Sequence, residues 1–245
     1  MVRALLIRGM IAGLLAGLLS VGFAEIFGEE PLVRAIAFEA AEHHADHGMT
    51  AEPEPVSRGV QSTIGLATAG IVYGVGLGGI FALVFAFAHG RGGPASPREL
   101  ALLLAGLGFV AIVLAPQLKY PANPPSIGEP GTIGERTALY FEMIAVSLSA
   151  LVLAVLAFAR FRPRLGGWNA ALVAGAVFVA VTGFAALLLP TVDEVPENFP
   201  AVVLWRFRVA ALGMQLVLWG SLGLVFGTLA ERALASTGRR VRSPA

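Results

Sequence analysis

Six long apolar runs, separated by short polar stretches, dominate the chain. They cover approximately residues 4–24, 62–88, 100–118, 138–159, 168–190 and 202–230. None shows the strict alternation of a barrel strand, and each is close to the about 20 apolar residues that a helix needs to cross a membrane. The pattern therefore predicts an all-α integral membrane protein with six transmembrane helices.

The composition agrees with this prediction. The chain has 245 residues, of which 56% are hydrophobic and 13% charged, and its mean hydropathy is +0.78; soluble domains carry about 25% charged residues. Thirty glycines suit membrane helices whose backbones approach closely. Because the chain has no cysteine, disulfides, thiolate metal ligands and thiol catalysis are excluded.

The distribution of charge predicts the orientation in the membrane. With the N-terminus inside, the inner segments hold eleven of the seventeen basic residues, and the inner acids are Glu99 and Glu231 alone. We therefore expect three in–out–in hairpins in one polytopic domain, residues 1–235, with a basic tail, 236–245, and both termini in the cytoplasm. An alternative is a signal peptide cut after Ala24, which would leave five spans.

The first outer loop, residues 25–61, holds the main candidate site. Acids at its start, Pro31 at an early helical position and Gly48 as a stop predict a helix. On that helix one face would carry most of the candidate metal ligands, while His44 points elsewhere. The candidates are Glu39, Glu42, His43, His44, Asp46 and His47. Imidazole and carboxylate suit divalent transition metals, and the alternative is a solvated acidic helix.

Polar residues inside the apolar runs predict a path for a cation. Charged groups at membrane depth are costly and usually face a partner or a water-filled cavity. We expect Glu142 to pair with Arg208, and Gln215 to share the face of Arg208. The alternative is that Arg206 and Arg208 extend to the interface beside Trp205. Glu25 would connect the first outer loop to this path.

The second outer loop is rich in proline and is expected to be stiff and extended, as a lid over the outer face. Its candidate lid residues are Lys119, Tyr120, Asn123 and Arg136. Met10, Met143 and Met214 are interpreted as core filling rather than as copper ligands, and His89 as an interface residue on the inner side.

The chain lacks the motifs of a P-loop ATPase, a zincin protease and an α/β-hydrolase, and has no basic, aromatic pattern for nucleic acid. We therefore expect no enzymatic activity. Two alternatives stay open besides transport. One is a membrane scaffold or assembly factor whose acidic loop docks a partner without moving an ion. The other is a membrane enzyme acting on a lipid.

Several motifs resemble one known family. "FGEEP", the His/Glu loop, "KYPANPPSIGEPGTIGERT" and "LPTVDEVPENFPAVVLWRFR" together look like the CbtA family of predicted cobalt transporter subunits. The resemblance implies cobalt uptake across the cytoplasmic (inner) membrane in support of cobalamin synthesis. It also implies a small one-span, His-rich partner, CbtB. That family is usually described with five spans, whereas six are counted here.

Three expectations follow for ligands and partners. No cofactor should be tightly bound, and the transported ion would be a divalent metal, with cobalt favoured and nickel or zinc possible. A His/carboxylate site would not by itself select cobalt, because affinity rises from cobalt through nickel to copper. Apart from the lipid bilayer and the CbtB-like subunit, a homo-oligomer is possible, and nucleic acid is not expected.

Overall fold

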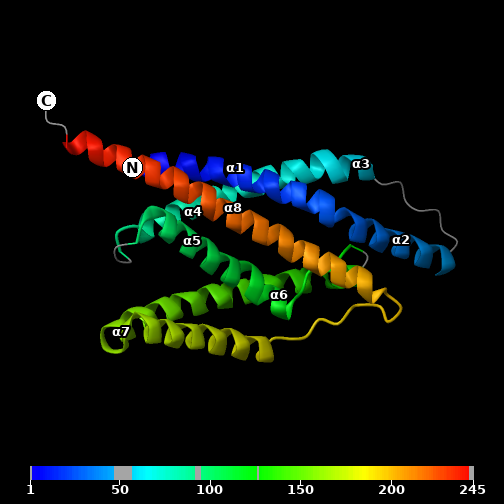
Figure 1. Ribbon diagram of the computed structural model, residues 1–245. Coiled ribbons are helices and arrows are strands. Elements are labelled where there is room, and N and C mark those ends of the chain that lie inside the picture. The colour runs from blue at the N-terminus through cyan, green and yellow to red at the C-terminus, as the bar shows by residue number, and fades with distance from the viewer. Residues whose placement is uncertain (1, 47–56, 92–94, 126, 243–245) are drawn as a thin grey trace. The chain divides into compact units, whose positions relative to one another are not determined.

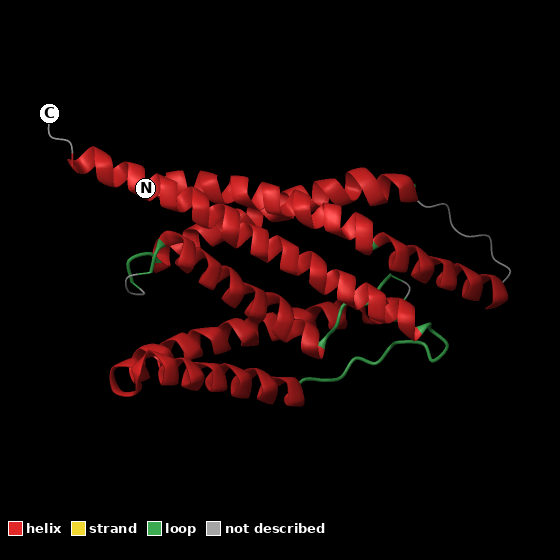
Figure 2. Ribbon diagram, viewed as in Figure 1, coloured by secondary structure: helices red, strands yellow, loops and turns green. Residues whose placement is uncertain are grey.

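In the computed structural model the chain is described for residues 2–46, 57–91, 95–125 and 127–242, and every regular element in these ranges is helical. Figures 1 and 2 show long helices, with a long loop between α7 and α8. The elements are α1 (Val2–Phe27), α2 (Glu29–Asp46), α3 (Arg58–Val60), the π-helix η1 (Gln61–Gly65), α4 (Leu66–Ala88), α5 (Pro97–Gly108), the π-helix η2 (Phe109–Leu114), α6 (Ala115–Lys119), the 3-10 helix η3 (Pro130–Thr132), α7 (Ile133–Leu188) and α8 (Ala201–Arg242).

Five helical stretches are long and apolar enough to cross a membrane: Val2–Phe27, Arg58–Ala88, Pro97–Lys119, Ile133–Leu188 and Ala201–Ala235. The fourth has 56 residues, or about 84 Å at 1.5 Å per residue, which far exceeds a bilayer core of about 30 Å. It is interrupted at Gly166, whose φ of 76° is left-handed. Each half of α7 is long enough to cross, so the helices provide five to six spans, as predicted.

The boundaries differ most from the prediction at two places. The last helix, α8, continues to Arg242, past the predicted end of the sixth span at 230 and into the predicted basic tail. The second place is the polar stretch "RFRPRLGG" between the fourth and fifth predicted spans, where the backbone is helical on both sides of Gly166. One left-handed glycine is enough to end one helix and start the next. The two halves of α7 then run back along each other, because Leu139 and Met143 of the first half pack against Ala186 and Leu189 near the end of the second (Figure 1).

The chain divides into two compact units, which are described separately. The first contains residues 1–106 and 209–245, and the second contains residues 107–208. In the first unit α1 and α4 form an antiparallel pair through glycines spaced four residues apart. Gly9, Gly13 and Gly17 lie against Gly78, Gly74 and Gly70 in that order. A Cβ at Gly13 would collide with the carbonyl oxygen of Gly74, so this approach requires glycine.

α8 packs on two other helices of the first unit. Gly223 and Gly227 contact Ala105 and Ala101 of α5, and Phe226 makes edge-to-face contacts with Phe81 and Phe85 of α4. These α5 and α8 residues pair in opposite chain order, so α5 and α8 are antiparallel. An ion pair between Arg98 and Glu231, 2.6 Å long, joins their ends. We conclude that up-and-down helix pairs, built on small and aromatic residues, form this unit.

The second unit has a π-helical segment just before Pro116. In η2 each N–H bonds five residues back, as the bond from Ala115 to the Val110 carbonyl shows. Pro116 has no N–H with which to bond the Ala111 carbonyl in the same way. The fully buried hydroxyl of Ser147 in α7 donates to that carbonyl instead. A side chain thus replaces a missing backbone donor, as membrane helices with proline require.

Candidate functional site

The His/acid stretch of the first outer loop begins on a helix, as predicted. α2 starts directly after Gly28, has Glu29 and Glu30 in its first turn, and continues to Asp46. Acids at a helix N-terminus complement its dipole, which explains why the helix starts there. The helical backbone therefore includes Glu39, Glu42, His43, His44 and Asp46. His47 lies outside the described residues, as do the side-chain placements from Glu42 onward.

The residues that the structure describes form no group of three or more His, Asp or Glu able to hold a metal ion. The side chains of His43 and His47 lie outside the described residues, so this result does not bear on their expected convergence on one metal ion. The metal-ligand prediction for α2 therefore stays a prediction, supported by the helical backbone and by the local charge.

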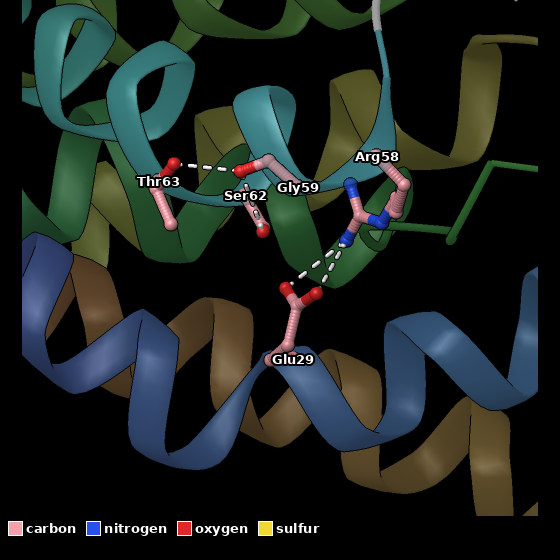
Figure 3. Close-up of polar contacts among 5 residues, drawn as sticks. All are labelled: Glu29, Arg58, Gly59, Ser62 and Thr63. Atoms are coloured by element: carbon pink, nitrogen blue, oxygen red, sulfur yellow. Dashed lines mark hydrogen bonds and ion pairs between the residues drawn. The ribbon is translucent and has the colours of Figure 1, made fainter.

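The outer loop is closed at its base by an ion pair that sequence reasoning missed. Nη2 of Arg58 donates to both carboxylate oxygens of Glu29, at 2.8 and 3.0 Å (Figure 3). Both side chains are about one-third exposed, at 33% and 29%. Next to it, the hydroxyl of Thr63 donates to the carbonyl of Gly59 at 2.6 Å. The ion pair thus joins the start of α2 to the start of α3, which are the two ends of the first outer loop.

In the second unit the structure brings together two proline-rich loops: the predicted second outer loop, between α6 and α7, and the predicted third outer loop, between α7 and α8. Arg136, a predicted lid residue, lies with Nε 3.2 Å from Oε2 of Glu194 in the third outer loop. Its terminal nitrogens donate to the carbonyls of Ile127 and Glu129 at 3.2 and 3.3 Å. The backbone N–H of Glu129 donates to the same Glu194 oxygen at 3.0 Å. We call Ile127, Glu129, Arg136 and Glu194 the loop clasp.

A glycine makes the loop clasp possible. Gly128 has a φ of 107°, and a Cβ there would collide with the guanidinium of Arg136 and the carboxylate of Glu194. The Arg136 and Glu194 side chains are only 23% and 20% exposed. These contacts therefore join the second outer loop to the third. The stiffness of the second loop and its role as a lid stay predictions.

Arg208 also binds the second loop, and this differs from the expected pairing. Its Nη2 donates to Oδ1 of Asn123 at 2.8 Å, and its Nε to the carbonyl of Ala122 at 3.3 Å. The ion pairs recorded within the described ranges do not include Glu142 with Arg208. Because Asn123 supplies a neutral acceptor in the proline-rich loop, the arginine is satisfied without a carboxylate.

Tyr120 connects the second loop to the end of α7. Its hydroxyl donates to the carbonyl of Pro190 at 2.8 Å, and its ring packs with Leu139 and Met143. Burial raises the pKa of the Tyr120 phenol, and the carboxylate of Glu142 raises it further. Lys119 lies with Nζ 5.7 Å from the Tyr120 ring centroid. Tyr120 is therefore a neutral donor over the physiological pH range.

The predicted path residues are divided between the two units: Glu25 and Gln215 belong to the first, Glu142 and Arg208 to the second. In the first unit Ser20 donates to the carbonyl of Met214 at 3.0 Å, which places Gln215 beside α1. Oε1 of Gln215 and Nε1 of Trp219, one turn apart, are buried and have no hydrogen-bond partner among the residues that the structure describes. Glu25 and Glu142 are exposed on α1 and α7.

The remaining candidates take structural positions. Met143 is 2% exposed within the core of the second unit, in agreement with its interpretation as core filling. His89 stacks on Phe85 with ring centroids 5.4 Å apart. Glycine spacing of four in two apolar runs was the available signal for the α1–α4 contact. No comparable spacing in the sequence indicates Glu29 with Arg58 or Arg136 with Glu194.

The comparison with known families covers almost the whole chain. A family model described as "Probable cobalt transporter subunit (CbtA)" matches residues 2–231. No curated protein and no solved structure matches. The matched range includes α2, both proline-rich loops and the helices of both units.

Proposed function

Since the chain belongs to the CbtA family of probable cobalt transporter subunits, we propose that it captures cobalt on the outer helix α2 and passes it through the membrane. Membership and the apolar helices make it a multi-pass membrane protein and a subunit, which implies a partner subunit. The observation that carries the finer proposal is the helical backbone of α2, which continues into the His/acid stretch.

Helical geometry supports α2 as a capture element. At 100° per residue, positions 39, 43 and 46 lie within about 60° of one another around the helix. Glu39, His43 and Asp46 thus occupy one face, and they offer one imidazole and two carboxylates. Borderline divalent ions accept this ligand set. His47 would add a second imidazole one turn after His43 if the helix continues.

Local charge supports the same role. From Glu25 to Arg58 the chain has eight acids and two arginines. Arg34 lies 2.6 Å from Glu30, and Arg58 binds Glu29, so each arginine is paired at the start of α2. The remaining acids of this segment therefore give it a net negative charge and a negative electrostatic potential. Such a field raises the local concentration of cations and their rate of arrival.

The proposal extends to the path and the surroundings. Glu25 and Gln215 in one unit, and Glu142 with Arg208 in the other, remain candidates for contacts below the outer surface. The chain would lie in the cytoplasmic membrane with both termini inside, and work with a small, His-rich, one-span subunit of the CbtB kind. Nickel or zinc would compete with cobalt because the ligands discriminate weakly.

Uptake of radioactive cobalt tests this function. Cells expressing the chain with its partner subunit should accumulate cobalt, and His43→Ala/His47→Ala should reduce the initial rate several-fold. His89→Ala is the matched control, since His89 stacks on Phe85 outside the outer loop, and it should leave uptake unchanged. An unchanged rate in the double variant would remove the capture role.

The same assay separates the transport function from the scaffold alternative. If wild type takes up no cobalt with or without its partner, while the two proteins still co-purify, the acidic loop docks a protein and no ion crosses. Membrane abundance must be equal for all variants, measured by immunoblotting.

A further inference from the structure

The bend between the two halves of α7 presents a basic, aromatic surface that the cobalt function does not use. Arg160, Arg162 and Arg164 lie within five residues of one another, just before Gly166. Every residue from 159 to 169 is exposed, and Trp168 is 78% exposed. We call Arg160, Arg162, Arg164 and Trp168 the bend surface.

No carboxylate of the described part of the chain pairs with the bend surface. Between Met143 and Val192 the sequence contains neither Asp nor Glu. Within the described ranges none of the three arginines of the bend surface forms an ion pair with a carboxylate. The three exposed guanidinium groups are therefore without a carboxylate partner among the described residues, and they are accessible to anions.

The arrangement of the arginines favours phosphate. Arg160 and Arg164 are four residues apart on a helical backbone, so they lie on one face about one turn apart. Their guanidinium groups are thus placed to bind one phosphate between them, and arginine binds phosphate through paired N–H donors. Arg162, on another face, has its guanidinium carbon 5.8 Å from the ring centroid of Phe158.

The apolar neighbours favour a lipid as the carrier of that phosphate. Leu165 is 42% and Phe161 37% exposed beside the arginines. Tryptophan and arginine together are typical of the membrane–water interface, where lipid phosphates lie. Both halves of α7 are apolar and of membrane-spanning length, so the bend between them falls at such an interface. A soluble phosphate would gain nothing from the exposed Trp168 and Leu165.

We propose that the bend surface binds the headgroups of anionic phospholipids and thereby anchors the α7 hairpin at the membrane surface. The proposal does not depend on which ion the protein moves. The phosphates contact Arg160 and Arg164, and Trp168 lies between the headgroups and the acyl chains.

Native mass spectrometry of the purified full chain tests it, with phosphatidylglycerol and phosphatidylcholine added at equal concentration. Wild type should retain more phosphatidylglycerol. Arg160→Gln/Arg162→Gln/Arg164→Gln should lose most of that preference, about five-fold or more. Arg3→Gln/Arg8→Gln/Arg232→Gln removes the same charge from the first unit and should keep the preference. Equal loss in both triple variants, or no loss in the bend variant, would overturn the proposal.

Two further measurements complete the test. Excess inorganic phosphate should not displace the bound phosphatidylglycerol; complete displacement would assign the surface to a soluble anion. If the bend variant does not fold, quenching of tryptophan fluorescence by brominated lipids tests the proposal on the chain with its three arginines intact. Brominated phosphatidylglycerol should quench more strongly than brominated phosphatidylcholine, and Trp168→Phe should remove that difference. Equal quenching by the two lipids would contradict headgroup recognition.

Discussion

At the scale of single residues, a few side chains satisfy groups that the helices leave open. Ser147 replaces the donor that Pro116 lacks, Asn123 accepts from Arg208, and Glu194 holds Arg136. In a membrane an unsatisfied backbone group is costly because no water replaces the lost partner. These contacts therefore fix helices and loops of the second unit in one arrangement.

Ser147→Ala should destabilise the protein by about 1 kcal/mol, because the buried carbonyl of Ala111 loses its donor. Ser149→Ala is the matched control: Ser149 is exposed and bonds only the Ala145 carbonyl in its own helix. Its effect should stay below about 0.5 kcal/mol. Unfolding in mixed micelles measures both, and equal effects would contradict the role of Ser147.

The raised pKa of Tyr120 gives a pH dependence with a definite sign. A group that binds its proton more tightly when folded contributes stability that is complete below its unfolded pKa, near 10. That stability is lost as pH rises through the folded pKa. Wild type should therefore lose stability above pH 10 more steeply than Tyr120→Phe. Parallel dependence of stability on pH for the two proteins would contradict the raised pKa of the Tyr120 phenol.

At the scale of elements, glycines at every fourth position of α1 and α4 allow the backbones of these two helices to come close together. Gly13→Ala should destabilise by about 1–3 kcal/mol, because a Cβ collides with the α4 backbone. Gly22→Ala, in the same helix, meets open space and should be neutral or stabilise by up to about 1 kcal/mol. Thermal unfolding of both variants measures the difference, and effects of the same sign would contradict the close approach.

How much of each element the sequence predicts depends on the range of the interactions. The six apolar runs predict the spans because burial in lipid depends on composition alone, and acids with Pro31 predict α2 because helix starts are local. The hydropathy pattern shows a polar stretch at the α7 bend, but it does not reveal that the left-handed conformation of Gly166 alone separates the two helices. The ion pair of Glu29 with Arg58 spans 29 positions of the sequence, and that of Arg136 with Glu194 spans 58. Helical periodicity indicates neighbours only three or four positions apart, so it does not reveal these pairs.

At the scale of the whole molecule, segregated charge predicts the orientation, and the antiparallel helix pairs are compatible with it. Because the chain has no cysteine, single cysteines report the side of the membrane directly. Glu197→Cys should react with an impermeant maleimide in intact cells, and Arg162→Cys only after the membrane is broken. The reverse result would contradict the predicted orientation of the second unit and place the loop clasp inside.

Equilibrium binding of cobalt to the purified full chain tests the central claim, capture by α2, most directly. Wild type should bind cobalt at pH 7, and His43→Ala/His47→Ala should weaken binding at least ten-fold, with His89→Ala unchanged. Equal affinity in wild type and the double variant would contradict capture by α2, whatever the protein transports.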